Sequence, residues 1–168
     1  ELPKQKIMHT EWMHADCLAD YYHVDVFSEE HWKILENYFK EYVKRGCNMM
    51  LTPLFTSPLD TAVGLERTTT QLIKVEVVKG EYRFEFSELK RWIDLCKKCG
   101  IEYYEMSHLF SQWGAKYAPK VVAEVDGKEE KLFGWHTQAV GEYTRFLKAF
   151  LPQLIEKLKE WNIDQVTY

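Results

Sequence analysis

Two segments place apolar residues three and four positions apart between capping residues, which predicts two amphipathic helices. The first covers residues 28–45, where Ser28 is a natural N-cap and is followed by two glutamates that suit the positive end of the helix dipole. The second covers residues 87–99, with Ser87 as its N-cap and Gly100 as the residue that ends it.

A longer apolar stripe predicts a third helix over residues 139–161. Pro152 lies within it, and because proline lacks the amide hydrogen that a helix needs, we expect a kink or a break near residues 148–152. A strand-like run follows each of the three helices almost at once, and another precedes the first helix. The predicted strands are residues 6–13, 47–54, 101–106 and 163–168. The predicted order is therefore β-α-β-α-β-α-β.

The connections between these elements are short on one side and long on the other. Turns from helix to strand take one or two residues, whereas the connections from strand to helix span residues 14–27, 56–86 and 108–138. Two of the long connections contain hairpin signals, with Lys79-Gly80 and Asp126-Gly127 at the turns. This asymmetry is typical of α/β enzymes and of (β/α)8 barrels in particular. An open doubly wound sheet is the alternative, although the glycine-rich phosphate turn that often follows its first strand is missing from the sequence.

The length of the chain decides how much of a barrel it can hold. A (β/α)8 barrel takes eight βα units and typically ~250 residues. These 168 residues hold three units and part of a fourth strand. We therefore expect an α/β chain that forms the N-terminal part of a TIM barrel, as one domain over residues 1–168 that is cut within strand 4. Its first and fourth strands would have unpaired edges, so we expect either self-association through these edges or an origin in a longer folded protein.

Charge and hydropathy narrow the class of partner. The formal net charge is −4 and the sequence has no cluster of basic residues, which argues against nucleic acid as the main partner. No apolar run approaches the ~18 residues of a membrane span, and the start carries no secretory pattern. The sequence leaves the compartment open between the cytoplasm and secretion.

The spacing of cysteine and histidine gives little support to a metal site. Cys96 and Cys99 form a CxxC pair, but the sequence has no second ligand pair at similar spacing, and the motif falls at the end of a helix. We interpret both as reduced structural thiols. His9 and His14 stand five positions apart, on opposite faces of any strand that contains both, which argues against a dinuclear centre. We therefore expect neither a metal nor a cofactor.

Candidate chemistry gathers after the first predicted strand. Residues 11–22 combine carboxylates, an imidazole and aromatic rings at the end of the barrel where active sites lie. Sugars are bound by such sets, because planar rings stack on C–H faces while carboxylates and histidine hydrogen-bond to hydroxyl groups. A ring such as Trp12 could instead pack under the loop, but the cluster as a whole favours a binding site.

The other two long connections offer fewer candidates. Asp60 follows a proline and a leucine and could simply cap a turn, while Glu66 and Arg67 could form a surface ion pair of little energetic value. His108 lies at the end of the third predicted strand, where barrel enzymes place polar contacts with their ligands. A histidine bonded to the backbone is an equally good interpretation of that position.

Three blocks of sequence, one at each of the first three predicted strand ends, resemble a known enzyme family. They are residues 9–12 with 16–22, residues 51–55 with 58–61, and residues 105–110 with 112–115. Together they resemble the catalytic domain of glycoside hydrolase family 123 and its uncharacterised bacterial relatives. The resemblance implies a (β/α)8 glycosidase that acts on β-linked N-acetylgalactosamine by a substrate-assisted retaining mechanism. In that mechanism the 2-acetamido oxygen of the sugar attacks the anomeric carbon and gives an oxazoline.

The resemblance also implies an Asp that orients the acetamido group and an adjacent Glu that protonates the leaving oxygen. It places this pair after the fourth strand, beyond Tyr168, so we assign no catalytic residue within the chain. The implied partner is a carbohydrate, and the candidate sugar-binding residues, chosen by position, are Trp12, His14, Asp16, Asp20, Asp60, His108, Trp113 and Trp135. Two alternatives stay open: a non-catalytic carbohydrate-binding relative that kept the barrel, and a metal-dependent barrel hydrolase.

Overall fold

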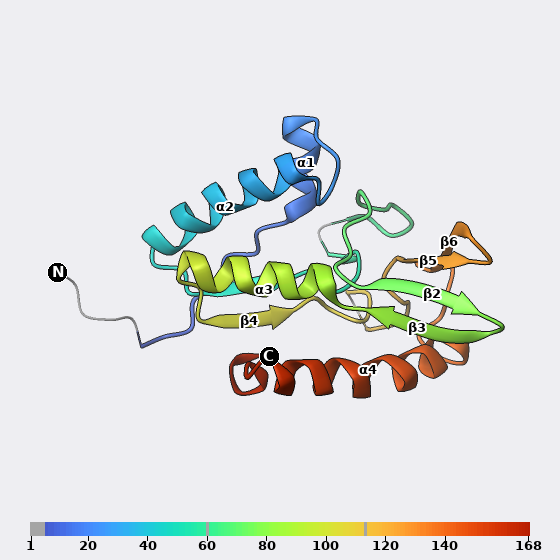
Figure 1. The fold of residues 1–168 in the computed structure, drawn as a ribbon. Helices are drawn as coiled ribbons and strands as arrows, with labels where there is room; N and C mark the ends of the chain where they lie inside the picture. Colours follow the sequence, from blue (N-terminus) through green and yellow to red (C-terminus); the bar gives the residue numbers. More distant parts are fainter. Residues whose placement is uncertain (1–5, 60, 113) are drawn as a thin grey trace.

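The computed structural model describes residues 6–59, 61–112 and 114–168. It is a mixed α/β structure with two small sheets (Figure 1). The three predicted helices and both predicted hairpins are present. In chain order the elements are α1 (Ala15–Tyr22), α2 (Glu29–Lys44), β1 (Met49–Thr52), β2 (Lys74–Val78), β3 (Glu81–Glu85), α3 (Ser87–Cys99), β4 (Tyr103–Met106), β5 (Val121–Val125), β6 (Lys128–Phe133), α4 (Glu142–Glu160) and the 3-10 helix η1 (Asp164–Val166).

The strands β1 and β4 pair in parallel and form the smaller sheet. Their register joins Met50 to Tyr104 and Leu51 to Glu105. Met50 and Tyr104 are fully buried, and burial, with smaller effects of Cys96 and Asp94 of α3, raises the pKa of Tyr104. Because side chains alternate between the two faces of a strand, Glu105 points to the face away from α3.

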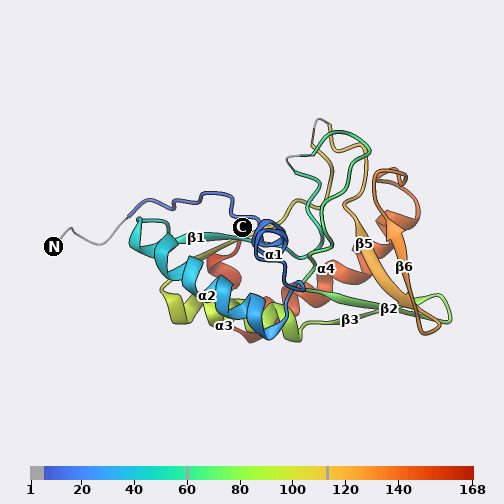
Figure 2. The same ribbon diagram turned by 90° about the horizontal axis from the view of Figure 1, so that it is seen from above.

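The ends of α2 and α3 explain how the chain returns quickly to these two strands. The helices lie side by side (Figures 1 and 2). Ser28 caps α2 by accepting a hydrogen bond from a backbone N–H of the first turn, as predicted. Gly100 ends α3 in the left-handed conformation, with φ at 94°. Ser87 is not the N-cap of α3, because Phe86 takes that position while the carboxylate of Glu85 accepts from both the N–H and the hydroxyl of Ser87.

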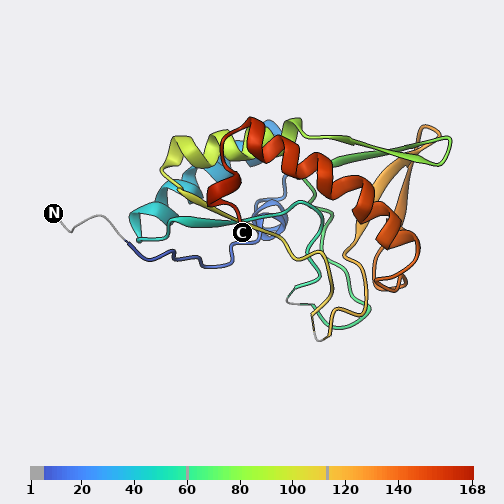
Figure 3. The ribbon, with the colours of Figure 1, turned by 90° about the horizontal axis from the view of Figure 1, so that it is seen from below.

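The two hairpins join into one four-stranded sheet of order β3-β2-β5-β6. Each hairpin is antiparallel, and β2 pairs with β5 in parallel between them. The loops that lead into the two hairpins lie side by side (Figures 2 and 3), and a bridge between Thr56 and Lys120 links them. The sequence predicts each hairpin from a local turn, whereas the junction joins segments that are far apart in the chain.

The helix α4 covers one face of the four-stranded sheet and continues toward the β1–β4 pair (Figures 1 and 3). Phe146 of α4 contacts Phe84 of β3 and Phe133 of β6, with ring centroids 5.4 and 5.2 Å apart. Phe150 contacts Phe84 and also Phe55, which lies in the loop after β1. This aromatic contact joins the two sheets into one hydrophobic core.

Pro152 does not break α4, so of the kink or break expected near residues 148–152, the break is wrong. The proline is exposed, and the side-chain amide of Gln153 donates to the carbonyl of Ala149 at 3.0 Å. The helix stays continuous because its buried face extends on both sides of the proline. The packing of this face outweighs the cost of the backbone hydrogen bond that the proline removes. The buried residues of α4 are Tyr143, Phe146, Phe150, Leu154 and Leu158.

The strand expected at residues 6–13 is absent from the described part of this segment. The segment is held beside the start of β1, where the carbonyl of His9 accepts from the N–H of Asn48 at 3.1 Å. Pairing stops there, because the N–H of Glu11 donates to the hydroxyl of Tyr42 at 2.7 Å. A tyrosine of α2 thus replaces the backbone partner that a strand would need.

Two further expectations, for residues 14–27 and for residues 163–168, need correction. The loop expected at residues 14–27 contains α1, which is only eight residues long and has no side-chain bond at its N-cap. The strand expected at residues 163–168 consists of η1 followed by an isolated parallel bridge between Tyr104 and Thr167. Over the described ranges, no helix combines the length and the apolar character needed to cross a membrane.

Candidate functional site

Ser107 ties together the carboxyl ends of β1 and β4. Its backbone N–H donates to the carbonyl of Thr52 at 2.9 Å, and its hydroxyl accepts from the N–H of Leu54 at 3.1 Å. Ser107 is buried, so these bonds are shielded from water. The two strands therefore deliver the segments that follow them to one end of the sheet.

Trp12, Glu105 and His108 meet at this end of the sheet. The indole N–H of Trp12 donates to both oxygens of the Glu105 carboxylate, at 3.0 and 3.2 Å. The exposed ring of His108 contacts the indole ring, with centroids 5.4 Å apart and planes at 76°. The bonds to Glu105 orient the indole ring. Trp12 remains 43% exposed, so the residue is still accessible to a ligand. Such a ring beside a carboxylate and an imidazole can stack on a sugar and bind its hydroxyl groups.

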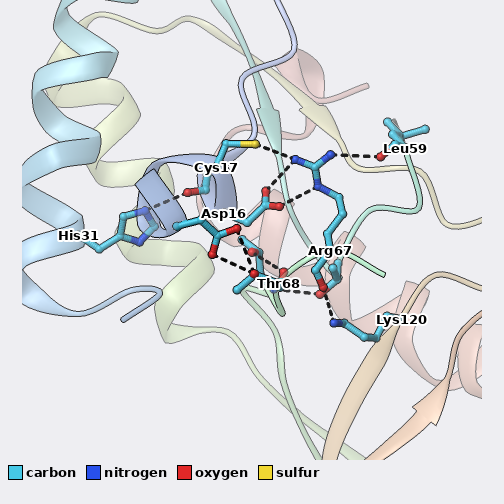
Figure 4. Close-up of polar contacts among 11 residues, drawn as sticks. Asp16, Cys17, His31, Leu59, Arg67, Thr68 and Lys120 are labelled. Atoms are coloured by element: carbon cyan, nitrogen blue, oxygen red, sulfur yellow. Dashed lines mark hydrogen bonds and ion pairs between the residues drawn. The ribbon is translucent and has the colours of Figure 1, made fainter. Parts of the chain in front are cut away.

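Asp16 forms an ion pair with Arg67 (Figure 4), at 2.7 Å from Nε to Oδ2 and 3.3 Å from Nη2 to Oδ1. The two side chains are only 9% and 10% exposed. Arg67 also donates to the carbonyl of Leu59, and its Nη2 lies 3.0 Å from the sulfur of Cys17. The alternative of a surface pair between Glu66 and Arg67 is therefore wrong, since Arg67 points inward to α1.

The surroundings keep the guanidinium charged. Burial alone would lower the pKa of Arg67, but the hydrogen bonds and the charge of Asp16, with smaller effects from Cys17, raise the pKa above its ordinary value. A bidentate arginine–carboxylate pair fixes both partners in direction as well as in distance. The pair thus anchors the loop between β1 and β2 to α1.

Two more contacts hold the loops around this ion pair (Figure 4). The hydroxyl of Thr68 donates to Asp20 of α1 at 2.9 Å. The ammonium of Lys120 donates to the backbone carbonyl of Arg67. Burial lowers the pKa of Lys120, and the charge of Glu66 opposes this effect. Asp20 and Lys120 therefore link α1 and both long loops into one polar network.

A small cavity lies against the ion pair. Its volume is ≈ 20 Å³, which is enough for about one water molecule and far too small for a sugar ring. The cavity walls include His14, Asp16, Thr56, Ser57, Arg67 and Ser107. His14 and Asp16 thus lie beside the loop that carries Arg67, whereas Trp12 is the exposed residue of the neighbouring group.

A buried histidine positions the start of α1. Nδ1 of His31 accepts from the N–H of Phe27 at 2.9 Å, and Nε2 lies 3.0 Å from the carbonyl oxygen of Ala15 (Figure 4). Because a carbonyl only accepts, this bonding assigns the proton to Nε2 and makes the ring neutral. Burial lowers the pKa of His31, against smaller opposing effects of the Ala15 carbonyl and Asp16.

Trp135 contacts residues other than those of the group formed by Trp12, Glu105 and His108. Its indole N–H donates to the carbonyl of Leu65 at 2.8 Å, and its ring contacts Tyr117 with centroids 5.8 Å apart. Trp135, which follows β6, therefore packs against the loop between β1 and β2 and the loop between β4 and β5. The two other predicted residues, Asp60 and Trp113, lie outside the described residues.

Among the described residues, no group of three or more His, Cys, Asp or Glu side chains is arranged to hold a metal ion. All four cysteines are free. Burial raises the pKa of both Cys96 and Cys99, which keeps these thiols protonated and agrees with a structural role.

Arg67 and Glu105 belong to the site although neither was among the predicted sugar-binding residues. The partner of Arg67 is 51 positions away in the sequence, so no local pattern could reveal it. A signal was present for Glu105, because it alternates with apolar residues at the end of a predicted strand. In a barrel, a carboxylate at such a position would face the inside.

Comparisons with known proteins agree on one family. The chain matches the family described as glycoside hydrolase 123, catalytic domain, over residues 12–168. It is similar to a family 123 glycoside hydrolase from Clostridium perfringens whose structural analysis addressed glycolipid glycan hydrolysis, with a TM-score of 0.70 and 20% identity. That match covers 94% of this chain and 28% of the other. None of the curated proteins matches the chain significantly. The chain therefore belongs to the glycoside hydrolase 123 catalytic-domain family.

Proposed function

We propose that the chain forms the N-terminal part of a (β/α)8 glycosidase domain whose longer parent protein hydrolyses β-linked N-acetylgalactosamine. Membership of the family supports this proposal, as does the parallel pairing of β1 and β4. Beside β4, a parallel bridge joins Tyr104 to Thr167, and the N–H of Tyr168 donates to Tyr104 while the carbonyl of Tyr168 accepts from Met106. Successive parallel strands, each placed beside the previous one, are what a barrel requires.

The group of Trp12, Glu105 and His108 is the observation that carries the proposal. It combines an accessible aromatic ring with a carboxylate and an imidazole at the carboxyl end of β4. Active sites of (β/α)8 enzymes lie at the carboxyl ends of their strands. We propose that Trp12 and His108, together with the other residues predicted to bind sugar, form one wall of the substrate site.

The proposed reaction is substrate-assisted. The 2-acetamido oxygen of the sugar attacks the anomeric carbon, the glycosidic C–O bond breaks, and the leaving oxygen takes a proton from a carboxylic acid. Water then attacks the anomeric carbon of the resulting oxazolinium ion, the bond from that carbon to the acetamido oxygen breaks, and the water returns a proton to the same residue. We propose that the Asp-Glu pair for these steps follows Tyr168, so the residues of this chain bind and orient the sugar.

The test compares nitrophenyl glycosides that differ in one group, using the parent protein. Nitrophenyl N-acetyl-β-galactosaminide is expected to be hydrolysed, whereas nitrophenyl β-galactoside is not, because it lacks the acetamido nucleophile. Equal rates on both would contradict substrate assistance. The glycan of a glycolipid is the second substrate to assay, since the similar family 123 enzyme was studied with glycolipid glycan hydrolysis in view.

The alternative is a non-catalytic carbohydrate-binding barrel. The contacts of Trp12 favour it as much as they favour an enzyme, because stacking and hydrogen bonding serve binding alone. Calorimetric binding of methyl N-acetyl-β-galactosaminide without hydrolysis of any nitrophenyl sugar, in a parent that lacks an Asp-Glu pair after Tyr168, would favour this alternative.

A further inference from the structure

Glu105 is a carboxylate in a half-buried position of a strand. Its register partner Leu51 is buried, and its chain neighbour Tyr104 fills the core on the opposite face. A charge in such a position costs free energy unless hydrogen bonds compensate for it. A carboxylate at the carboxyl end of a parallel strand, on the face away from the helices, therefore needs a reason beyond packing.

The bonding of Glu105 leaves acceptor capacity unused. An ionised carboxylate offers about four lone-pair sites, and the indole N–H of Trp12 is shared between its two oxygens. Within the part of the chain that the structure describes, no Lys or Arg side chain forms an ion pair with Glu105. The carboxylate can therefore accept further hydrogen bonds from a ligand while it holds the indole.

The same contact controls the ring of Trp12. The two bonds of 3.0 and 3.2 Å fix the indole plane, and the ring of His108 contacts it at 76°. Trp12 as a whole remains 43% exposed. A fixed ring binds with a smaller loss of conformational entropy than a mobile one, because its orientation exists before the ligand arrives.

We propose that Glu105 is a sugar-binding residue that acts with Trp12 as one unit. A pyranose ring stacks on the exposed part of the indole, and a hydroxyl group of the same pyranose donates a hydrogen bond to the Glu105 carboxylate. This inference rests on the proposed function and adds a sugar contact to the set predicted from the sequence. It assigns Glu105 to binding and leaves the proton transfers to other residues.

The test uses the parent protein and methyl N-acetyl-β-galactosaminide as the probe, with affinity measured by calorimetry. Glu105→Gln keeps the size of the side chain and an oxygen that accepts from Trp12, but removes the charge. Affinity is expected to fall about fivefold to tenfold, because a hydrogen bond to a charged acceptor is roughly twice as strong as one to a neutral acceptor. Trp12→Ala is expected to lower affinity about tenfold or more. The matched control is Glu130→Gln, at an exposed glutamate of β6.

Kinetics and the unmodified protein provide independent readouts. In Glu105→Gln, KM for nitrophenyl N-acetyl-β-galactosaminide is expected to rise with kcat nearly unchanged. This is the result of losing an interaction that binds the ground state and the transition state equally. In the unmodified protein, the indole N–H resonance of Trp12, assigned with Trp12→Phe, is expected to shift when the probe is added. This readout does not depend on the folding of any variant that removes the carboxylate.

The outcomes separate this inference from the proposed function. If the unmodified protein binds the probe but Glu105→Gln binds within twofold of it, or the Trp12 resonance does not move, the inference is overturned and the proposed function stands. If the unmodified protein neither binds nor hydrolyses any of the sugars, the inference and the proposed function fall together.

Discussion

The ion pair of Asp16 and Arg67 is the main polar link between α1 and the loop after β1, and its loss has a predictable cost. Asp16→Asn would leave the Arg67 charge buried with a neutral partner. Breaking a buried pair in this way costs about 3–5 kcal/mol, so we expect the free energy of unfolding to fall by about 3 kcal/mol. Urea unfolding measures this change, and the exposed Asp25→Asn is the control. A change as small as that of the control would contradict the assigned role.

His31 predicts how stability depends on pH. Its pKa is lowered in the folded chain, chiefly by burial, from an ordinary value of 6.5. As the pH falls below 6.5, the unfolded chain therefore takes up a proton that the folded chain does not, and the free energy of unfolding decreases. We expect stability to fall between pH 7 and pH 5, and His31→Gln to reduce this slope. The exposed His136→Gln is the control, and an unchanged slope in His31→Gln would contradict the prediction.

At the residue scale, the sequence predicts what is local and misses what is distant. The cap at Ser28 and the stop at Gly100 follow from neighbouring residues, and the structure confirms both. The cap at Ser87 fails because Glu85, two residues before it, competes for the same groups. The partner of Arg67 lies in another element, so local sequence could not identify it.

At the scale of elements, α4 depends on its aromatic contact with the second sheet. Phe146 is fully buried and contacts rings of β3 and β6. Phe146→Ala would leave a cavity at this contact, and we expect the free energy of unfolding to fall by about 3–5 kcal/mol. Thermal or urea unfolding measures it. The exposed Lys148→Ala, two positions along the same helix, is expected to change stability little, and equal effects of both would contradict this packing.

Helices with a long apolar stripe and hairpins with a distinct turn are predicted well from the sequence, whereas short elements are not. Three helices and two hairpins match the structure, because each has a long apolar stripe or a distinct turn. The helix α1 was missed because it has only eight residues and no side-chain cap bond. The strand expected at residues 6–13 fails because Tyr42 binds the N–H of Glu11 in place of a backbone partner. Packing of α4 on both sides of Pro152 outweighs the tendency of the proline to break the helix.

At the scale of the whole molecule, the chain on its own has exposed strand edges and apolar groups. Among the described residues, β1 is bonded at its start to the segment before it, and β4 is bonded near the chain end through a bridge at Thr167 and two backbone bonds with Tyr168. Ile7 and Tyr21 are about three-quarters exposed. Unpaired edges favour pairing between copies. We therefore expect the isolated 168-residue chain to self-associate, and light scattering tests this. A clean monomer with cooperative melting would contradict the expectation.

We propose that this chain supplies the sugar-binding wall of a glycosidase whose catalytic pair follows Tyr168. The most direct test is hydrolysis of nitrophenyl N-acetyl-β-galactosaminide by the parent protein, with the 168-residue chain assayed alongside it. We expect hydrolysis by the parent protein and none by the 168-residue chain. Hydrolysis by the 168-residue chain itself would contradict it, because carboxylates within this chain would then perform the chemistry.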